Sequence, residues 1–202
     1  MPEVNRMKRS SEKTFGFDHF RRFTKTLLDP EKALREIGLK KGDTLLDAGC
    51  GEGSFSIPAA QIVGDSGKVY AVDVSEEAIN TLKKEARKKG IKNIEAFAGD
   101  ITKRLPIEDG SIDVCMMANI LHGLVAAKKA ESTLKEVFRV LAPSGILAVV
   151  DFKKVDDPPG PPKSIRMTPE EVEGIISRYG FEKERVAEVG KYHYAVVFKK
   201  LH

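Results

Sequence analysis

The segment Thr44-Leu45-Leu46-Asp47-Ala48-Gly49-Cys50-Gly51-Glu52-Gly53 joins a short apolar run to three closely spaced glycines. An apolar run of this length that stops at glycines is typical of a buried strand. Glycines also permit a tight turn and a close approach of the backbone to a ligand. We therefore predict a strand, a glycine turn and then a helix over residues 54–63.

Strand and helix patterns keep alternating beyond this unit. Strands separated by helices of about 10–15 residues favour a parallel sheet that is covered on both faces, so the predicted fold class is α/β. Ser75 followed by two acidic residues is an N-cap signature for one of these helices. The further strands are predicted over 67–73, 93–98, 112–117 and 145–151, and the helices over 75–89 and 128–141.

The C-terminal third departs from the alternation. Thr168-Pro169-Glu170-Glu171 places an N-cap before a proline at the first helical position, which predicts a helix as far as Arg178. Residues 181–189 and 192–199 follow as two strands joined at Gly190-Lys191, with no helix between them. The sheet is therefore expected to end in an antiparallel hairpin.

Length and composition restrict the class of protein. The chain has 202 residues, of which 41% are hydrophobic and 32% charged, and this fits one substantial core. No run approaches the ~18 apolar residues of a membrane helix, and the N-terminal residues lack the apolar stretch of a secretory signal. We therefore expect a cytoplasmic protein without a membrane partner. Cys50 and Cys115 lie outside any metal-ligand spacing, so no metal site is predicted.

The formal charge of +4 arises near the N-terminus. Residues 1–41 hold 11 Lys and Arg against 6 Asp and Glu. The excess is small and spread along a segment that resembles a helix, and we interpret it as a solvated helical face. Nucleic acid is therefore not an expected partner.

A nucleoside site is indicated where the first two strands end. Asp73 closes the second strand 20 residues beyond Gly53, and a carboxylate there can accept the hydroxyl hydrogens of a ribose. The turn reads G-x-G-x-G, whereas a dinucleotide site reads G-x-G-x-x-G. Asp47 and Glu52 would repel a phosphate and suit a cationic ligand. S-adenosylmethionine carries such cations, an ammonium and a sulfonium.

With these features the chain resembles the class I S-adenosylmethionine-dependent methyltransferases, from about Leu39 to the C-terminus. Residues 45–53 are similar to the first motif of that family, and residues 136–147 to the helix that leads into its fifth strand. The wider pattern is similar to the branch that contains ubiquinone and menaquinone biosynthesis enzymes and many unassigned small-molecule methyltransferases. The resemblance implies a Rossmann-like, doubly wound, mainly parallel seven-stranded sheet of order 3-2-1-4-5-7-6. It also suggests an N-terminal helical arm or lid over residues 1–38 and a methyltransferase domain over 39–202.

The resemblance also implies a set of cofactor ligands. The glycine turn and Asp47 hold the methionine portion, Asp73 binds the ribose, and the segment at Asp100 reads the adenine edge. The exit of the fourth strand, from Met116 to His122, lines the site. The expected residues that bind S-adenosyl-L-methionine, or its product S-adenosyl-L-homocysteine, are Asp47, Gly49, Cys50, Gly51, Gly53, Asp73, Val74, Asp100, Ile101 and Asn119.

Two residues are candidates for work on the methyl acceptor. His122 follows the fourth strand and could act as a base, or it could be a buried or capping histidine. Asp151 closes the fifth strand and could bind the acceptor, or it could cap the next loop. His193 lies within the last strand, where a half-exposed position is expected.

The acceptor is expected to be a small molecule enclosed by two segments. Residues 14–24 carry an aromatic cluster, which is either part of the core or a lid over an apolar acceptor. Residues 153–166 form a proline-rich connection that starts at the fifth strand. A non-catalytic S-adenosylmethionine-binding module and, with less support, an NAD-dependent dehydrogenase are the alternatives. The acceptor's identity, the atom that is methylated, the need for a base and the presence of a homo-oligomer stay open. The aromatic residues are Phe15, Phe17, Phe20 and Phe23.

Overall fold

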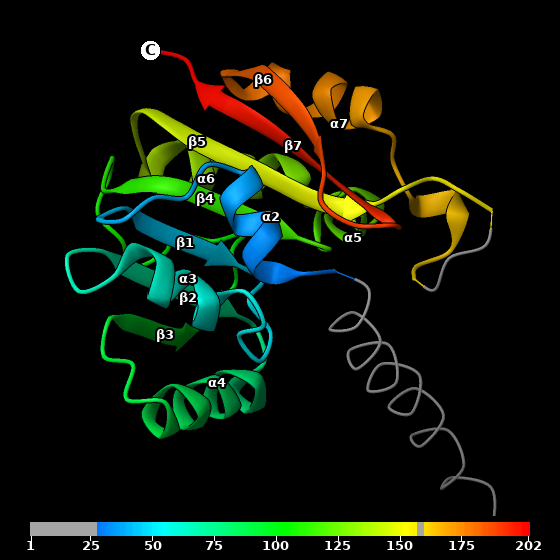
Figure 1. Cartoon of the computed structure of the whole chain (residues 1–202). Helices are drawn as coiled ribbons and strands as arrows, with labels where there is room; N and C mark the ends of the chain where they lie inside the picture. The colour runs from blue at the N-terminus through cyan, green and yellow to red at the C-terminus, as the bar shows by residue number, and fades with distance from the viewer. Residues whose placement is uncertain (1–27, 157–159) are drawn as a thin grey trace, which may run out of the picture.

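A seven-stranded sheet forms the centre of the molecule. The computed structural model describes residues 28–156 and 160–202. The strands are β1 (Thr44–Ala48), β2 (Lys68–Asp73), β3 (Ile94–Ala98), β4 (Ile112–Ala118), β5 (Leu141–Phe152), β6 (Phe181–Glu188) and β7 (His193–Lys200). Their order is β3-β2-β1-β4-β5-β7-β6 (Figure 1), which confirms the expected order. β1 to β5 run parallel, while β7 runs antiparallel to both β5 and β6, so the C-terminal hairpin is confirmed as well.

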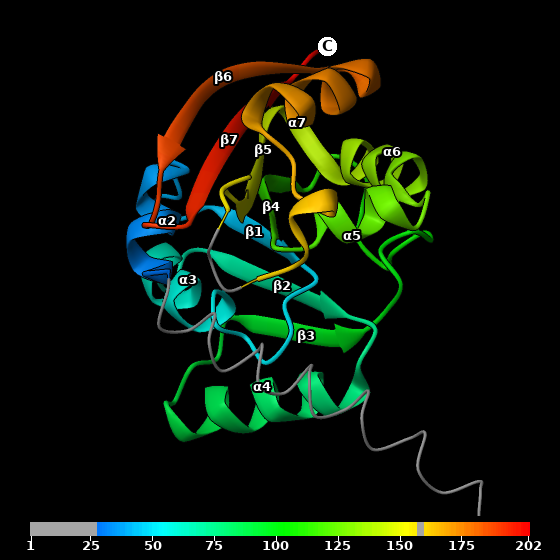
Figure 2. The ribbon, with the colours of Figure 1, turned by 90° about the vertical axis from the view of Figure 1, so that its right-hand side faces the viewer.

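Helices cover both faces of this sheet, as a doubly wound fold requires. α2, α3 and α4 pack on one face, and α5, α6 and α7 pack on the other (Figure 2). The helices are α2 (Pro30–Glu36), α3 (Ser56–Val63), α4 (Glu76–Lys88), α5 (Leu121–Ala126), α6 (Ala130–Val140) and α7 (Pro169–Ile176), with short 3-10 turns η1 (Lys163–Ile165) and η2 (Ser177–Tyr179).

Neighbouring residues of β1 enter two different cores. Leu45 packs among residues of α2 and α3, whereas Leu46 packs among residues of α5, α6 and α7. Both side chains are fully buried. Since each such burial contributes about 1.5–3 kcal/mol, a central strand is stabilised by a continuous apolar run and not by an alternating one. This explains why the run before the glycines folds as a strand between two helical layers.

Side-chain caps set the starts of two helices. The hydroxyl of Ser75 accepts a hydrogen bond from the backbone N–H of Ala78 at 3.2 Å. Thr168 and Glu171 form a reciprocal capping box at the start of α7, with distances of 3.3 and 2.8 Å. Both caps satisfy backbone donors that have no partner inside a helix, so the predicted starts are confirmed.

The fifth strand begins earlier than the sequence predicts. α6 ends at Val140, and Leu141 already pairs with Ile112 of β4, although Pro143 and Gly145 indicated a turn there. Lys200 on β7 holds this junction, because its ammonium donates to the carbonyls of Phe138 and Leu141 at 2.7 and 2.6 Å. Hydrogen bonds from this distant residue hold the end of α6 in place, and β5 therefore spans Leu141–Phe152.

The N-terminal arm is described only from Leu28 onward. Asp29 caps α2, and Leu28, Ala33 and Leu34 are buried in the core on that face of the sheet. The aromatic cluster of residues 14–24 lies outside the described residues. The part of the arm that the structure describes is thus continuous with the core of the domain.

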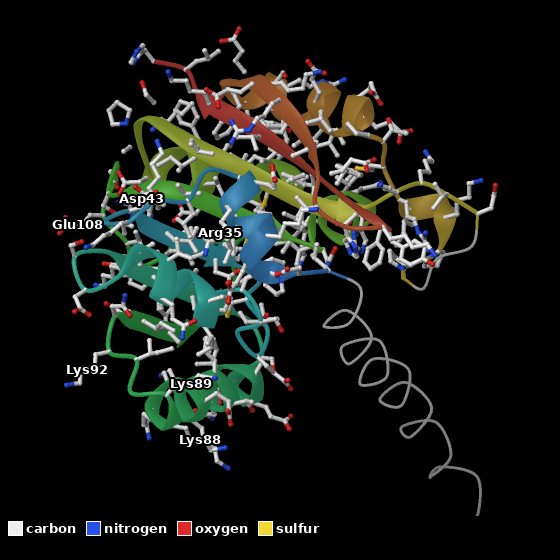
Figure 3. All side chains as sticks on the ribbon, in the orientation of Figure 1. Arg35, Asp43, Lys88, Lys89, Lys92 and Glu108 are labelled. Carbon is white, nitrogen blue, oxygen red and sulfur yellow. The ribbon has the colours of Figure 1, made fainter. Side chains whose placement is uncertain are left out.

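Surface charges on the described part of the chain point to solvent. Lys88 and Lys89 at the end of α4, and Lys92 after it, extend away from the ribbon (Figure 3) and are exposed. Across residues 28–156 and 160–202, no helix has both the length and the apolar character needed to cross a bilayer.

Candidate active site

The glycine turn after β1 is held against the end of β2. The backbone N–H groups of Gly49 and Cys50 both donate to the carbonyl of Val72, at 2.8 and 3.0 Å. Gly49 and Gly53 adopt positive φ angles of 77° and 84°, which side chains on Cβ disfavour. A Cβ on Gly49 would also lie 2.8 Å from Ile120. The turn therefore requires glycine for its conformation and for the closeness of its neighbours.

Asp73 joins the glycine turn to the residues that lead into α4. One carboxylate oxygen accepts from the N–H of Gly51 at 2.8 Å, and the other accepts from the N–H of Ser75 at 2.9 Å. Each oxygen keeps a further lone pair, and Asp73 lines the adjacent cavity. The carboxylate is therefore fixed in place and still able to accept hydrogen bonds from a ligand.

A cavity of about 750 Å³ opens where the parallel strands end. This is the edge of an open α/β sheet at which ligands bind, because the strand order reverses between β1 and β4. The residues that follow β1, β2, β3 and β4 all reach it. Seven expected site residues line this cavity, namely Gly49, Asp73, Val74, Asp100, Ile101, Asn119 and His122.

One end of the cavity has an apolar and an acidic wall. Val74 is 73% exposed, which is unusual for valine and leaves apolar surface for a flat ligand to cover. Asp100 accepts from the N–H of Thr102 at 2.9 Å. Hydrogen bonding from Thr102, together with the charge of Lys129, holds the pKa of Asp100 below its ordinary value. An ionised acceptor beside an apolar face suits the amino group and ring of adenine.

Asn119 carries a buried hydrogen-bond acceptor for which the described residues supply no donor. Its φ angle of 58° is left-handed, and its N–H donates to the carbonyl of Val150 at 2.8 Å. In the described part of the chain, the side-chain Oδ1 is buried and has no hydrogen-bond partner. Since an unsatisfied buried acceptor costs about 1–3 kcal/mol, a donor from a ligand would stabilise this residue.

His122 and Asp151 form a buried pair beside the cavity. Nδ1 of His122 lies 2.8 Å from one carboxylate oxygen of Asp151 and 3.1 Å from the other. The exposed fractions are 9% for His122 and 1% for Asp151. Nδ1 is therefore the ring nitrogen that faces the carboxylate, and Nε2 is not engaged by Asp151. The pair therefore has the arrangement of a base and the residue that orients it.

Five expected site residues do not line the cavity. Asp151 contacts His122, which lines the cavity, while Cys50, Gly51 and Gly53 shape the turn. Asp47 is buried at 1% exposure and accepts from the hydroxyl of Ser56 at 2.5 Å. Burial raises the pKa of Asp47 to about 7. The structure thus places Asp47 beneath the turn.

Several lining residues were not expected from the sequence. Gly123 and Leu124 lie on α5, a six-residue helix whose pattern is too short to recognise. Lys129 lies just before α6, and its charge did not distinguish it from other surface lysines. The proline-rich connection had been expected at the site, and it contributes the residues Gly160, Pro161, Pro162 and Ile165.

Fold and site together define a class of protein. A sheet of this order, with a glycine turn, an acidic residue after β2 and an antiparallel C-terminal hairpin, has the form of the class I S-adenosylmethionine-dependent methyltransferases. The family model described as a methyltransferase domain matches residues 39–195, so the chain belongs to that family. S-adenosylmethionine is the cofactor that this membership assigns to the cavity.

Individual relatives agree with this membership. A crystal structure of a SAM dependent methyltransferase from Aquifex aeolicus superposes with a TM-score of 0.80 and 38% identity, over 87% of this chain and 91% of that one. The demethylmenaquinone methyltransferase of Lactococcus lactis is 35% identical over 59% of this chain and 46% of that protein. A probable cobalt-precorrin-6B C(15)-methyltransferase of Saccharolobus solfataricus is 48% identical over 30% of this chain and 31% of that protein. The chain spans less than half the length of these two curated relatives.

Proposed function

We propose that this protein transfers the methyl group of S-adenosylmethionine to a small quinol-type acceptor, with His122 as the general base. The observation that carries the proposal is the His122–Asp151 pair, which is buried against the cavity wall with Nε2 free of the carboxylate. A module that only bound the cofactor would need the glycine turn and Asp73, and it would not need an oriented base at the same cavity.

The described residues fit the cofactor. Asp73 can accept from the ribose hydroxyls, and Asp100 can accept from the adenine amino group. The unpartnered Oδ1 of Asn119 suits the ammonium of the methionine portion, which has only donors to offer. When bound, the cofactor supplies a methyl group on a positively charged sulfur.

The chain's own contribution is alignment, exclusion of water and removal of a proton. Proximity and orientation can supply about 7–11 kcal/mol of barrier reduction. Asp151 holds the imidazole of His122 in one orientation, and Nε2 takes the proton that the acceptor loses as it gains the methyl group. The products are then the methylated acceptor, S-adenosylhomocysteine and a protonated His122, so atoms and charge balance.

The name of a relative and the lining of the cavity together favour a quinol as the acceptor. The Lactococcus relative is named for demethylmenaquinone, and the cavity beside His122 is bordered by apolar side chains such as Ile120, Leu124 and Ile165. A quinol hydroxyl is weakly acidic, which matches an imidazole base. The match to the precorrin enzyme covers only 30% of this chain, so a tetrapyrrole serves as the comparison acceptor in the test. A cytoplasmic location stays a prediction from the sequence, and the presence of a homo-oligomer stays open.

Turnover tests the proposed activity. The full-length protein is incubated with S-adenosylmethionine and reduced 1,4-naphthoquinone, and S-adenosylhomocysteine is measured. We expect turnover, and His122→Gln should lower kcat by about 10²–10⁴-fold because proton removal is lost. His193→Phe is the matched control, since His193 is also buried near Asp151 but does not line the cavity. Methylation of a precorrin but not of any quinol would overturn the acceptor class.

Calorimetry tests the cofactor assignment independently of turnover. Asp73→Ala should weaken both S-adenosylmethionine and S-adenosylhomocysteine by about 10–100-fold, because the ribose loses hydrogen bonds to a charged group that are worth about 1.5–3 kcal/mol. Glu77→Ala on the exposed face of α4 is the control and should leave both affinities unchanged. Unchanged affinity in Asp73→Ala would remove this residue from the site.

A further inference from the structure

The loop from β3 to β4 forms one wall of the cavity with its first residues. Gly99 to Thr102 line the cavity. The N–H of Gly99 donates to the carbonyl of Asp73 at 2.9 Å, so the loop starts fixed to the end of β2. A tight turn follows, in which the N–H of Lys103 donates to the carbonyl of Asp100 at 2.9 Å. The position of this wall therefore also depends on what holds the chain after the turn.

Two charged side chains of α6, Glu136 and Arg139, hold the chain after the turn. A carboxylate oxygen of Glu136 accepts from the N–H of Leu105 at 2.7 Å. The guanidinium of Arg139 donates to the carbonyls of Leu105 and Ile107 at 3.2 and 2.8 Å. The backbone carbonyl of Arg139 accepts from the N–H of Gly110 at 3.0 Å. Both backbone groups of Leu105 are thus bonded to this pair, which we name the α6 clamp.

The α6 clamp is a largely buried ion pair. Nε of Arg139 donates to one carboxylate oxygen of Glu136 at 2.9 Å, and Nη2 donates to the other oxygen. The exposed fractions of the two side chains are 14% and 10%. Burial raises the pKa of Glu136, but hydrogen bonds from Arg139 and from Leu105 outweigh it and hold the pKa below its ordinary value. Because desolvation largely offsets the attraction within such a pair, its main effect is to fix the backbone that it contacts.

Core packing connects the α6 clamp to the cavity. Ile101 lines the cavity and lies in the same apolar cluster as Leu105, Ile107 and residues of α6. Thr102 lies only three positions before Leu105, and its N–H donates to the carboxylate of Asp100. The segment that carries Asp100 therefore has both ends fixed, one by β2 and the other by α6.

We propose that Glu136 and Arg139 are positioning residues, which hold residues 100–102 where the carboxylate of Asp100 meets the amino group of adenine. This inference rests on the proposed role of Asp100 toward the cofactor, and it requires nothing of the methyl acceptor or of His122. A clamp that only supported the fold would leave the preference for adenine unchanged when it was weakened. A positioning clamp would lower that preference.

Calorimetry distinguishes positioning from general support of the fold. The full-length protein is titrated with S-adenosylhomocysteine and with S-inosylhomocysteine, in which a carbonyl replaces the amino group of adenine. We expect the unchanged protein to favour the adenine compound by at least about tenfold, since the charged acceptor Asp100 loses its donor in the other compound. Arg139→Lys keeps the positive charge but loses the planar fork that reaches two carbonyls. It should lower the preference to less than about threefold.

Two further variants complete this test. Glu136→Gln keeps the shape of the α6 clamp and should lower the preference in the same direction, so the result does not depend on the folding of one variant. Asp109→Asn is the matched control, because Asp109 is an exposed ion-pair partner of Arg139 and such pairs contribute little. It should keep the preference of the unchanged protein.

Thermal unfolding identifies the variants that are folded. A preference of about tenfold that persists in both Arg139→Lys and Glu136→Gln would overturn the inference. Equal affinities of the unchanged protein for the two compounds would overturn it as well, because adenine would then not be read at its amino group. Turnover of reduced 1,4-naphthoquinone reports separately on the proposed function.

Discussion

His193 is a fully buried histidine. Within residues 28–156 and 160–202, neither of its ring nitrogens has a hydrogen-bond partner. Its ring packs on Phe152 with centroids 4.1 Å apart. The half-exposed position expected from strand alternation is wrong, because β7 lies between β5 and β6 with helices on both faces. Asp151, Arg166 and Lys153 are the charged groups that act on it.

This histidine predicts a dependence of stability on pH. Burial lowers the pKa of His193 from 6.5 to about 4, so the unfolded chain takes up a proton first. Stability present above pH 6.5 is therefore lost as the pH falls through 4, by about 3 kcal/mol in total. The free energy of unfolding, measured in urea at pH 7 and at pH 4.5, should differ less for His193→Phe than for the unchanged protein. His202→Gln, at the exposed C-terminal residue, should behave as the unchanged protein. An equal difference in the free energy of unfolding between the two pH values in all three proteins would contradict the prediction.

At the scale of elements, the connection from β5 to α7 is tied together by Arg166. Its guanidinium Nε donates to the carbonyl of Pro161 at 2.8 Å, and Nη1 lies 3.4 Å from the carbonyl oxygen of Lys153. Arg166 is 5% exposed, and its guanidinium lies 5.6 Å from the ring centroid of Phe152. One side chain thereby joins the start of the connection to the prolines that line the cavity.

Loss of this tie should separate acceptor binding from cofactor binding. Arg166→Met is expected to raise the acceptor KM by about tenfold or more, because hydrogen bonds from a charged group contribute about 1.5–3 kcal/mol each. The affinity for S-adenosylhomocysteine should change by less than about twofold, since backbone groups of Gly51, Ser75 and Thr102, and not the connection, hold Asp73 and Asp100. Trypsin should also cleave faster at Lys163. Arg178→Met, at an exposed arginine of η2, is the control. Equal losses of acceptor and cofactor affinity would refute the role of this tie.

At the scale of the molecule, one domain holds the whole candidate site. Residues from after β1 to the connection before α7 line a single cavity, and the core that supports them begins at Leu28. Residues 14–24, predicted to enclose the acceptor, lie outside the described residues. Their predicted role therefore has to be tested by removing them.

Deletion of residues 1–24 should leave the domain folded, because Leu28 and α2 remain in the core. We expect S-adenosylhomocysteine affinity within about threefold of that of the full chain. Methyl transfer should fall by at least about tenfold if the aromatic residues exclude water from the acceptor. Replacement of Phe15, Phe17, Phe20 and Phe23 by serine in the full-length chain should reproduce this loss. Full activity of the deletion variant would exclude the lid.

The sequence alone was enough to predict the strands of the sheet, the hairpin and the glycine turn. The reason is that these features have local signatures. Leu45 and Leu46 form a continuous apolar run, and Gly49 needs a positive φ angle. Asp73 closes the very next strand. Each signal lies within a few residues of the structure that it determines.

Only the tertiary structure decided which side chains meet. His122 and Asp151 are 29 positions apart, and the sequence proposed each of them without pairing them. Asp47 was expected to hold the ligand, yet its carboxylate lies beneath the turn with Ser56. The burial of His193 depends on β7 lying between β5 and β6, which come from other parts of the chain. Burial and pairing are properties of neighbours in space, and the local pattern around a residue does not encode which distant segment becomes its neighbour.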